Sequence, residues 1–328
     1  TFGEGKLGHF LYPGAHYAGK VFIEEIGFPK EALEKTAPKH FFYHPEDVKE
    51  LFPKRIPNSH KGSYGKLLVI AGSEDISGAA FFAAKAAYLM GCGLVKVVTH
   101  ENNRSMLQEK LPEALHAFYG KRMFRENEDG EEGIPDLRED ISWASAVVTG
   151  PGLGTDAAAK ALLAQVLEIR DKPVLIDADG INLLAGEERY VKNGELFLPE
   201  NFILTPHMLE MSRLTGTPLA ELKAHPLEYV KKTREGAVFV LKDARTLVSD
   251  GEWVYVNVSG NSALSKGGSG DVLSGMIGGL LARGVERFLA AALGVYLHGL
   301  TAEEYIKDRS SSSMLASDIL EMLPRVLP

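Results

Sequence analysis

Short runs of Val, Ile and Leu alternate with longer stretches of helical periodicity from Lys66 onward. Such continuous apolar runs are typical of strands buried on both faces, as in a parallel sheet between two layers of helices. The pattern predicts strands at residues 67–71, 94–99, 146–149, 174–177, 202–205 and 237–241. We therefore expect an α/β protein with a central, mostly parallel sheet flanked by helices on both faces.

Several of the predicted strands end in Gly, Asp, Thr or His. In a doubly wound sheet, ligands bind beyond the carboxyl ends of the strands. We therefore expect the chemistry of this protein at that edge of the sheet.

Three segments depart from the alternation. Residues 246–258 predict an antiparallel hairpin at an edge of the sheet, with a two-residue turn at Asp250 and Gly251. Residues 121–140 are dominated by charge and have no apolar period, which is typical of a solvated surface excursion. Residues 1–29 contain one predicted strand, 21–26, and too little apolar material for a core of their own, so they must pack on something else.

Two apolar helices are expected near the carboxyl terminus. Residues 272–283 form the first, which Gly284 ends, and residues 288–305 form the second, which carries His298. We interpret His298 as a core or interface residue, because a lone His on an apolar helix usually packs. Small residues at 78–93 and 290–294 permit close packing of helices within the core or between subunits.

Composition narrows the classes of function. The 328 residues are 45% hydrophobic and 24% charged, which fits one large globular domain or one domain with an attached piece. The net charge of −8 argues against nucleic-acid binding, which depends on neutralising many backbone phosphates with Lys and Arg. Any phosphate site must therefore be local.

Cysteine usage and the apolar stretches indicate a cytoplasmic protein. Cys92 is the only cysteine, so no intrachain disulfide forms and a zinc site with several thiolates is excluded. The longest apolar stretch, residues 78–95, contains Lys85, and the amino terminus has no basic region followed by an apolar run. Neither membrane insertion nor secretion is indicated.

A glycine-rich segment, residues 260–271, leads directly into the first of these helices. A loop of this kind presents free main-chain N–H groups beside the positive end of the helix dipole, which favours an anion such as phosphate. Its expected phosphate contacts are Lys266, Gly267, Gly268, Ser269 and Gly270. The order of residues differs from a Walker A loop.

Asp271 closes this segment and has two interpretations. An Asp at the start of a helix is commonly a cap that contributes about 1 kcal/mol. A carboxylate beside a bound phosphate also opposes phosphate binding, which is tolerated where a general base is needed. We expect Asp271 to deprotonate a substrate hydroxyl.

The segment from Gly267 to Asp271 resembles the GGTGD-type signature of the ribokinase-like superfamily. The flanking motifs are similar to those of the NAD(P)H-hydrate dehydratase family over about residues 60–328. They include Ser77-Gly78-Ala79, Gly150-Pro151-Gly152-Leu153-Gly154, Asp177-Ala178-Asp179-Gly180-Ile181-Asn182, Thr205-Pro206-His207 and Val240-Leu241-Lys242. Each motif is weak alone, but together in this order they are specific.

The resemblance implies roles for individual residues. Asp271 is the catalytic base, and the substrate contacts also include Ala79, Gly152, Gly154 and His207. The adenine nucleotide contacts Lys242, Asp243, Ala244, Arg245, Thr246 and Gly270. By composition alone, residues 242–246 are a loop and His207 is a structural residue at a strand end.

Asp179 and Asn182 offer oxygen ligands just beyond a predicted strand. They can orient a phosphate-bound Mg²⁺ or its water molecules. An Asx turn after the strand explains them equally well.

Two positions depart from the family pattern. Met208 and Leu209 stand where the family usually has Pro-Gly before Glu210, which affects the geometry of that loop. Asp243 stands where the family usually has Gly after the Lys, which affects contacts on the adenosine side.

The amino-terminal residues resemble a different domain. Tyr12-Pro13-Gly14 and Ile26-Gly27-Phe28-Pro29 are similar to the final stretch of an NAD(P)H-hydrate epimerase domain, which many prokaryotes fuse ahead of the dehydratase. This implies that residues 1–40 are the end of an epimerase-like domain plus a linker, and that residues 41–328 form the dehydratase domain. The parent protein is then bifunctional.

The function implied by the resemblance is ADP-dependent dehydration of the (S)-hydrates of NADH and NADPH, with Mg²⁺ and transient phosphorylation of the ring hydroxyl. ADP is preferred to ATP because the fused architecture is prokaryotic. The family also implies a homo-oligomer, a tetramer or larger. Two alternatives stay open: a kinase of a vitamin-precursor alcohol or a sugar, whose phosphorylated product accumulates, and a nucleotide sensor without catalytic activity.

Overall fold

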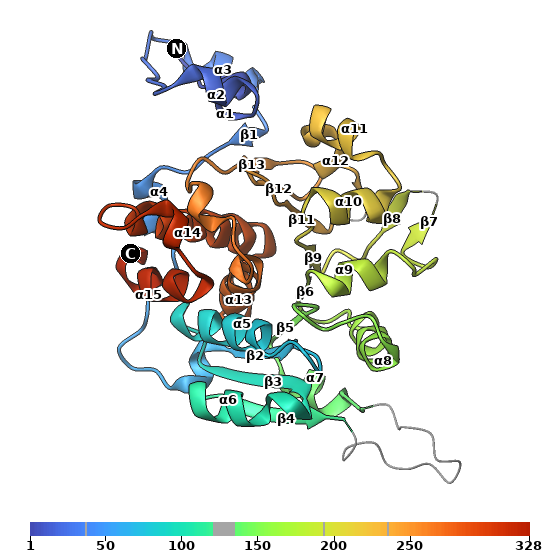
Figure 1. Cartoon of the computed structure of the whole chain (residues 1–328). Helices are drawn as coiled ribbons and strands as arrows, with labels where there is room; N and C mark the ends of the chain where they lie inside the picture. Colours follow the sequence, from blue (N-terminus) through green and yellow to red (C-terminus); the bar gives the residue numbers. More distant parts are fainter. Residues whose placement is uncertain (37, 121–134, 193, 235) are drawn as a thin grey trace.

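The computed structural model describes residues 1–36, 38–120, 135–192, 194–234 and 236–328. Its centre is a ten-stranded sheet that runs through the whole molecule (Figure 1). In spatial order the strands are β1 (His40–Phe41), β13 (Val254–Val256), β12 (Leu247–Ser249), β11 (Val238–Leu241), β9 (Phe202–Leu204), β6 (Val174–Ile176), β5 (Ala146–Thr149), β2 (Lys66–Ile70), β3 (Leu94–His100) and β4 (Leu115–Tyr119). Every pairing is parallel except those of β12 with β11 and β13.

Helices cover both faces of this sheet. One layer contains α4 (Pro45–Leu51), α5 (Gly78–Leu89), α6 (Arg104–Lys110), α13 (Ser269–Ala282), α14 (Arg287–Tyr305) and α15 (Ala316–Val326). The other contains α7 (Arg138–Trp143), α8 (Ala157–Val166), α9 (Asp179–Leu184), α10 (Met208–Thr215), α11 (Leu219–Ala224) and α12 (Pro226–Val230). Successive residues of a strand pack in two different hydrophobic cores. Leu67 and Val69 face the first layer of helices, and Leu68 and Ile70 face the second. The predicted fold class is confirmed.

All six predicted strands form, with bounds that differ by at most one residue at either end. The strand β4 was not predicted, because its His and exposed Leu115 break the apolar run. A separate small sheet of β10 (Thr233–Arg234), β8 (Glu195–Phe197) and β7 (Val191–Lys192) was also missed, since strands this short carry no periodic signal. Of the charged segment, residues 121–134 lie outside the described residues.

The predicted hairpin is present, but two details were wrong. Ser249 pairs with Val254, so four residues rather than two form the turn. The carboxylate of Asp250 accepts hydrogen bonds from the N–H groups of Glu252 and Trp253 and thereby stabilises the longer turn. The hairpin is also not the edge, because β1 pairs with β13 beyond it.

The amino-terminal segment, residues 1–36, projects from the body of the protein (Figure 1). It contains three short helices, α1 (Leu7–Phe10), α2 (Gly14–Ala18) and α3 (Lys30–Thr36). The strand predicted at residues 21–26 was wrong, because only a single bridge joins Phe2 and Glu24. An isolated pairing this short has no sheet to extend it, and Phe22 and Ile26 are more than half exposed.

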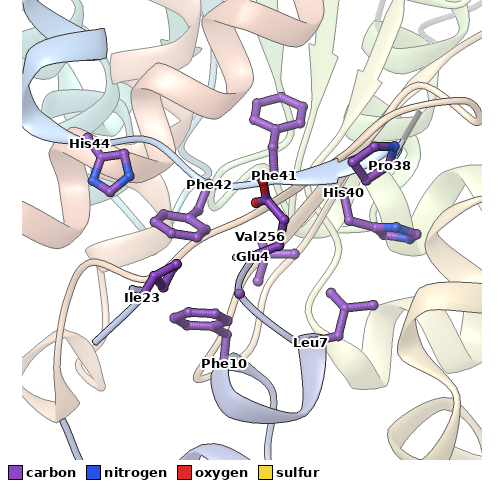
Figure 2. Close-up of a pocket in the computed structure, with 11 residues that line it drawn as sticks. Glu4, Leu7, Phe10, Ile23, Pro38, His40, Phe41, Phe42, His44 and Val256 are labelled. Carbon is purple, nitrogen blue, oxygen red and sulfur yellow. The ribbon is translucent and has the colours of Figure 1, made fainter. Parts of the chain in front are cut away.

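A pocket of about 690 Å³ separates this segment from the main body. Figure 2 shows Leu7 and Phe10 on one side and Phe41 and Phe42 on the other. The segment therefore rests on the sheet edge through an incompletely filled apolar contact.

The helices α5 and α13 approach each other at backbone distance. A Cβ atom on Gly275 would lie 2.0 Å from the carbonyl oxygen of Ala83, and one on Gly279 would lie 2.8 Å from that of Ala87. Glycine is therefore required at Gly275 for this packing. The small residues of the stretch 78–93 thus allow this close packing within the chain.

No helix among the described residues is long and apolar enough to cross a membrane.

Candidate active site

Four neighbouring strands deliver polar residues to one edge of the sheet. The glycine loop at Gly150 follows β5, Asp177 follows β6, His207 lies three residues beyond β9, and Lys242 follows β11. The order of these strands in the sheet is β11-β9-β6-β5. The carboxyl edge that the sequence indicated for chemistry thus gathers the predicted residues.

The glycine-rich turn precedes α13 at this edge. Gly268 caps the helix with φ +87°, and a Cβ atom there would lie 2.9 Å from Cβ of Ala316, so both conformation and space require glycine. The N–H groups of Lys266 and Ser269 are bonded within the turn, to Leu264 and Lys266 carbonyls respectively.

Four other N–H groups of this turn point to an anion site. In the described parts of the chain, no acceptor takes a hydrogen bond from the N–H of Gly267, Gly268, Gly270 or Asp271. They lie at the positive end of a 14-residue helix. The turn can therefore bind an anion through main-chain donors.

Asp271 lies in the first turn of α13, mostly withdrawn from solvent. Burial and the neighbouring carboxylates of Asp177 and Asp179 raise the pKa of Asp271 to about 6, against an opposing effect of Lys242. A carboxylate with this pKa is ionised at neutral pH and yet more basic than an ordinary Asp. This is the property that a general base needs.

Asp177 is the centre of a buried network that the sequence did not single out. One carboxylate oxygen lies 2.6 Å from Nζ of Lys242, and the other accepts a hydrogen bond of 2.6 Å from the hydroxyl of Ser274. Burial opposes ionisation of this residue, which is 1% exposed, but the bonds from Lys242 and Ser274 hold its pKa below the usual value. Asp177 is therefore a fixed negative charge beside Asp271.

The backbone after Asp177 is strained. Ala178 has φ +48°, a conformation that residues with a Cβ atom rarely adopt. Gly150 makes room for it, because a Cβ atom there would lie 1.9 Å from the carbonyl oxygen of Asp177. Strain of this kind is concentrated at functional sites.

The predicted nucleotide contacts separate into two groups. Lys242 lies at the site, since its Nζ is 3.5 Å from the position of a Cβ atom on Gly270. The side chain of Arg245 instead donates to the carbonyl of Val258 and braces the hairpin, while Asp243 and Ala244 are exposed and Thr246 is partly exposed. Lys242 thus places its charge beside the glycine-rich turn, whereas Arg245 is bonded to the hairpin.

His207 begins α10 and is tied to Glu210. Its Nδ1 accepts hydrogen bonds from the N–H groups of Leu209 and Glu210, so the ring proton resides on Nε2, 3.3 Å from the Glu210 carboxylate. Burial raises the pKa of Glu210, and Lys242 counteracts the rise. The His-x-x-Glu spacing, which is similar to that of a capping box, is the sequence signal for Glu210.

The other predicted substrate residues lie next to one another. A Cβ atom on Gly152 would be 2.8 Å from that of Ala79, which joins the glycine loop to the start of α5. The N–H of Gly154 donates to Asp179. These contacts bring Ala79, Gly152 and Gly154 to the same edge as Asp179.

Asp179 and Asn182 are both occupied by protein contacts. Asp179 accepts from Gly154 over 2.9 Å, and Asn182 accepts from the guanidinium of Arg213 over 3.0 Å. The described residues contain no group of three or more His, Cys, Asp or Glu that could hold a metal ion. The donor set therefore fits a metal carried mainly by phosphate oxygens rather than one caged by the protein.

Comparison with known proteins decides the family. A profile of the NAD(P)H-hydrate dehydratase family matches residues 67–325. The chain belongs to this family. It is 42% identical over 277 residues to the ADP-dependent (S)-NAD(P)H-hydrate dehydratase of Neisseria meningitidis serogroup B. This alignment covers 82% of this chain and 87% of that protein.

Two further similarities extend this result to longer relatives and to structure. The chain is 35% identical over 337 residues to the bifunctional NAD(P)H-hydrate repair enzyme of Moorella thermoacetica, covering 100% of this chain but 61% of that enzyme. The ADP/ATP-dependent NAD(P)H-hydrate dehydratase of Bacillus subtilis, co-crystallised with ATP and Mg²⁺, superposes with a TM-score of 0.72 at 34% identity over 87% of this chain and 96% of that one. The predicted ribokinase-like fold is thereby confirmed.

Proposed function

We propose that this protein dehydrates the (S)-hydrates of NADH and NADPH, with ADP as the phosphoryl donor and ATP as the alternative. The observation that carries the proposal is the juxtaposition of an anion-binding turn with Asp271, a carboxylate whose pKa is raised to about 6. Membership of the dehydratase family supplies the substrate and the nucleotide.

The reaction follows from this arrangement. Asp271 removes the proton of the ring hydroxyl, whose oxygen then bonds to the terminal phosphorus of the nucleotide while the bond to the bridging oxygen breaks. ADP is thereby converted to AMP. The lone pair of the ring nitrogen expels the new phosphate, and loss of a proton from the neighbouring carbon restores the double bond.

The remaining site residues have supporting roles. The N–H groups of Gly267, Gly268 and Gly270, with Lys242 beside them, bind the polyphosphate, while Ala79, Gly152, Gly154 and His207 contact the nicotinamide substrate. Ser269 and Lys266 complete the turn. A Mg²⁺ ion bound with the nucleotide would neutralise charge on the phosphates, and Asp179 and Asn182 are the residues that would orient its water molecules.

Incubation of the protein with hydrated NADH, ADP and Mg²⁺ tests the function. We expect the near-ultraviolet absorbance of the dihydronicotinamide to return, with one AMP and one phosphate formed for each NADH. A stable phosphoester of another alcohol, without recovery of NADH, would instead identify a small-molecule kinase. Nucleotide binding with no turnover of either kind would identify a sensor.

The pH dependence of dehydration provides a prediction about Asp271. A general base must be unprotonated, so kcat/KM should fall as the pH drops through about 6, the raised pKa of Asp271. Initial rates at low substrate across pH 4.5–8 measure this limb directly, because kcat/KM reports groups of the free enzyme. An acid limb near the ordinary Asp value of about 4 would contradict the assignment.

We also propose that residues 1–40 are the end of an epimerase-like domain and a linker, ahead of a dehydratase domain at residues 41–328. The chain spans 61% of the Moorella bifunctional enzyme that it matches throughout. Phe2, Tyr17 and Phe22 are 65%, 82% and 60% exposed, which suits a surface covered by further protein. The intact mass of the native protein, purified from its source, tests this.

We propose two further properties, an oligomeric state and a location. A homo-oligomer, tetramer or larger, follows from the family, and light scattering of the purified chain measures it. A cytoplasmic location follows from the single buried Cys92 and the nicotinamide substrates, and fractionation of source cells tests it.

A further inference from the structure

The segment between β13 and α13 is held at both ends by a single helix, α14. At the first end, the hydroxyl of Ser259 donates to the carbonyl of Tyr296 over 2.8 Å, and the N–H of Gly260 donates to the carboxylate of Glu303 over 2.8 Å. Gly299 permits this contact, since a Cβ atom there would lie 2.1 Å from the Ser259 hydroxyl. The glycine-rich turn is the far end of this segment.

At the far end, His298 of α14 contacts Ser269. Its Nε2 lies 3.1 Å from the carbonyl oxygen of Ser269 and 3.2 Å from its hydroxyl oxygen, and both residues are more than nine-tenths buried. A carbonyl oxygen can only accept, so Nε2 must carry a proton and act as the donor. Burial lowers the pKa of His298 to about 4, so the ring is neutral and keeps one proton.

Ser269 lies between the two glycines that shape the anion site. Gly268, with its positive φ, precedes it, and Gly270 and Asp271 follow it with N–H groups that have no acceptor in the described chain. The direction of these N–H groups therefore depends on where the first residue of α13 is held. A contact from another helix fixes that position more firmly than the turn can by itself.

We propose that His298 is a positioning residue for nucleotide binding. Its imidazole N–H, supplied from α14, holds Ser269 and thereby aims the main-chain donors of Gly267, Gly268 and Gly270 at the polyphosphate. The proposal rests on the assignment of this turn as the nucleotide site under the proposed function. It assigns a role to a buried histidine whose Nε2 contacts Ser269.

Two amide variants of the full chain separate positioning from packing. His298→Gln places an amide nitrogen about where Nε2 lies, whereas His298→Asn ends one bond shorter and cannot reach Ser269. Both bury the same polar group, so the cost of burying it cancels between them. Thr301→Val is the matched control, because Thr301 is buried on the same helix and, among the described residues, its hydroxyl donates only to the carbonyl oxygen of His298 within that helix.

Calorimetric titration with ADP and Mg²⁺ measures the effect without any need for turnover. We expect about tenfold weaker ADP binding for His298→Asn, and binding within about threefold of the unmodified chain for His298→Gln and for Thr301→Val. In dehydration assays, the KM for ADP should rise in the Asn variant while the KM for the hydrate stays constant.

Equal ADP affinity in the Asn and Gln variants would overturn the proposal, as would a loss of affinity in Thr301→Val as large as that in His298→Asn. Failure of the proposed function has a different signature. In that case the unmodified chain binds ADP but does not regenerate NADH, and the ranking of the variants by ADP affinity still decides the role of His298.

Discussion

Replacing Asp271 by Asn is expected to lower kcat for ADP-dependent dehydration by about three orders of magnitude, because the amide cannot accept the proton of the ring hydroxyl. ADP binding should persist or strengthen, since a negative charge beside the phosphates is removed. Single-turnover kinetics and calorimetric titration with ADP measure the two effects separately. Retention of turnover within tenfold of the unmodified chain would exclude Asp271 as the base.

The same variant should be more stable than the unmodified chain at neutral pH. The pKa of Asp271 is raised to about 6 in the folded state, so the folded protein binds this proton more tightly than the unfolded chain does. The free energy of unfolding of the unmodified chain then decreases as the pH rises from about 4 through about 6. Above that range the Asn variant avoids this loss, which is about 3 kcal/mol. Urea unfolding at pH 5 and pH 7.5 measures this difference in the free energy of unfolding between the variant and the unmodified chain. Asp156→Asn is the matched control, because Asn caps α8 as well as Asp does.

Replacing Asp177 by Asn should destabilise the protein by about 2 kcal/mol at neutral pH, because Lys242 loses the carboxylate 2.6 Å from its Nζ. The side chain of Lys242 is 20% exposed, so water partly compensates and the effect lies below that of a fully buried pair. The pKa of Asp177 is lowered in the folded state, so its contribution is present at neutral pH and is lost as the pH falls below the usual Asp range. Urea unfolding should show that the free energies of unfolding of the variant and the unmodified chain become more similar as the pH falls into the acid range.

Asp177→Asn should also move the acid limb of kcat/KM to lower pH. The substitution removes the negative charge of Asp177, which after burial contributes most to the raised pKa of Asp271. Ser274→Ala is the comparison variant, since it deletes one hydrogen bond to Asp177 and leaves the charge in place. That variant should cost about 1 kcal/mol of stability and should shift the acid limb less than Asp177→Asn does. An unchanged acid limb in Asp177→Asn would show that Asp177 does not act on the base.

The sequence was sufficient to predict the main sheet and the glycine-rich turn at the start of α13, because both depend on local signals. Each buried strand is a continuous apolar run, and the turn combines glycines with the start of an apolar helix. The strand at residues 21–26 failed for the opposite reason, since an alternating pattern needs a neighbouring strand that the amino-terminal segment does not supply.

The sequence could not predict which side chains contact the predicted site residues. Asp177 and Lys242 are 65 residues apart and leave strands that are not adjacent, so only the strand order brings their charges together. His298 and Ser269 meet through helix packing, which no spacing along the chain encodes. The sequence thus predicted which residues lie at the carboxyl edge of the sheet, whereas the contacts of Asp177 and His298 required the structure.

The close approach of α5 and α13 fixes how far apart the two helices begin. One starts at Gly78, next to Ala79, the other starts at the glycine-rich turn, and at Gly275 the main chain of α13 lies directly against that of α5. A Cβ atom on Gly275 would collide with the carbonyl oxygen of Ala83, so any larger residue there must push the helices apart. The spacing between Ala79 and the turn is therefore set by contact between main chains, and rotamer changes of side chains cannot relieve such a collision.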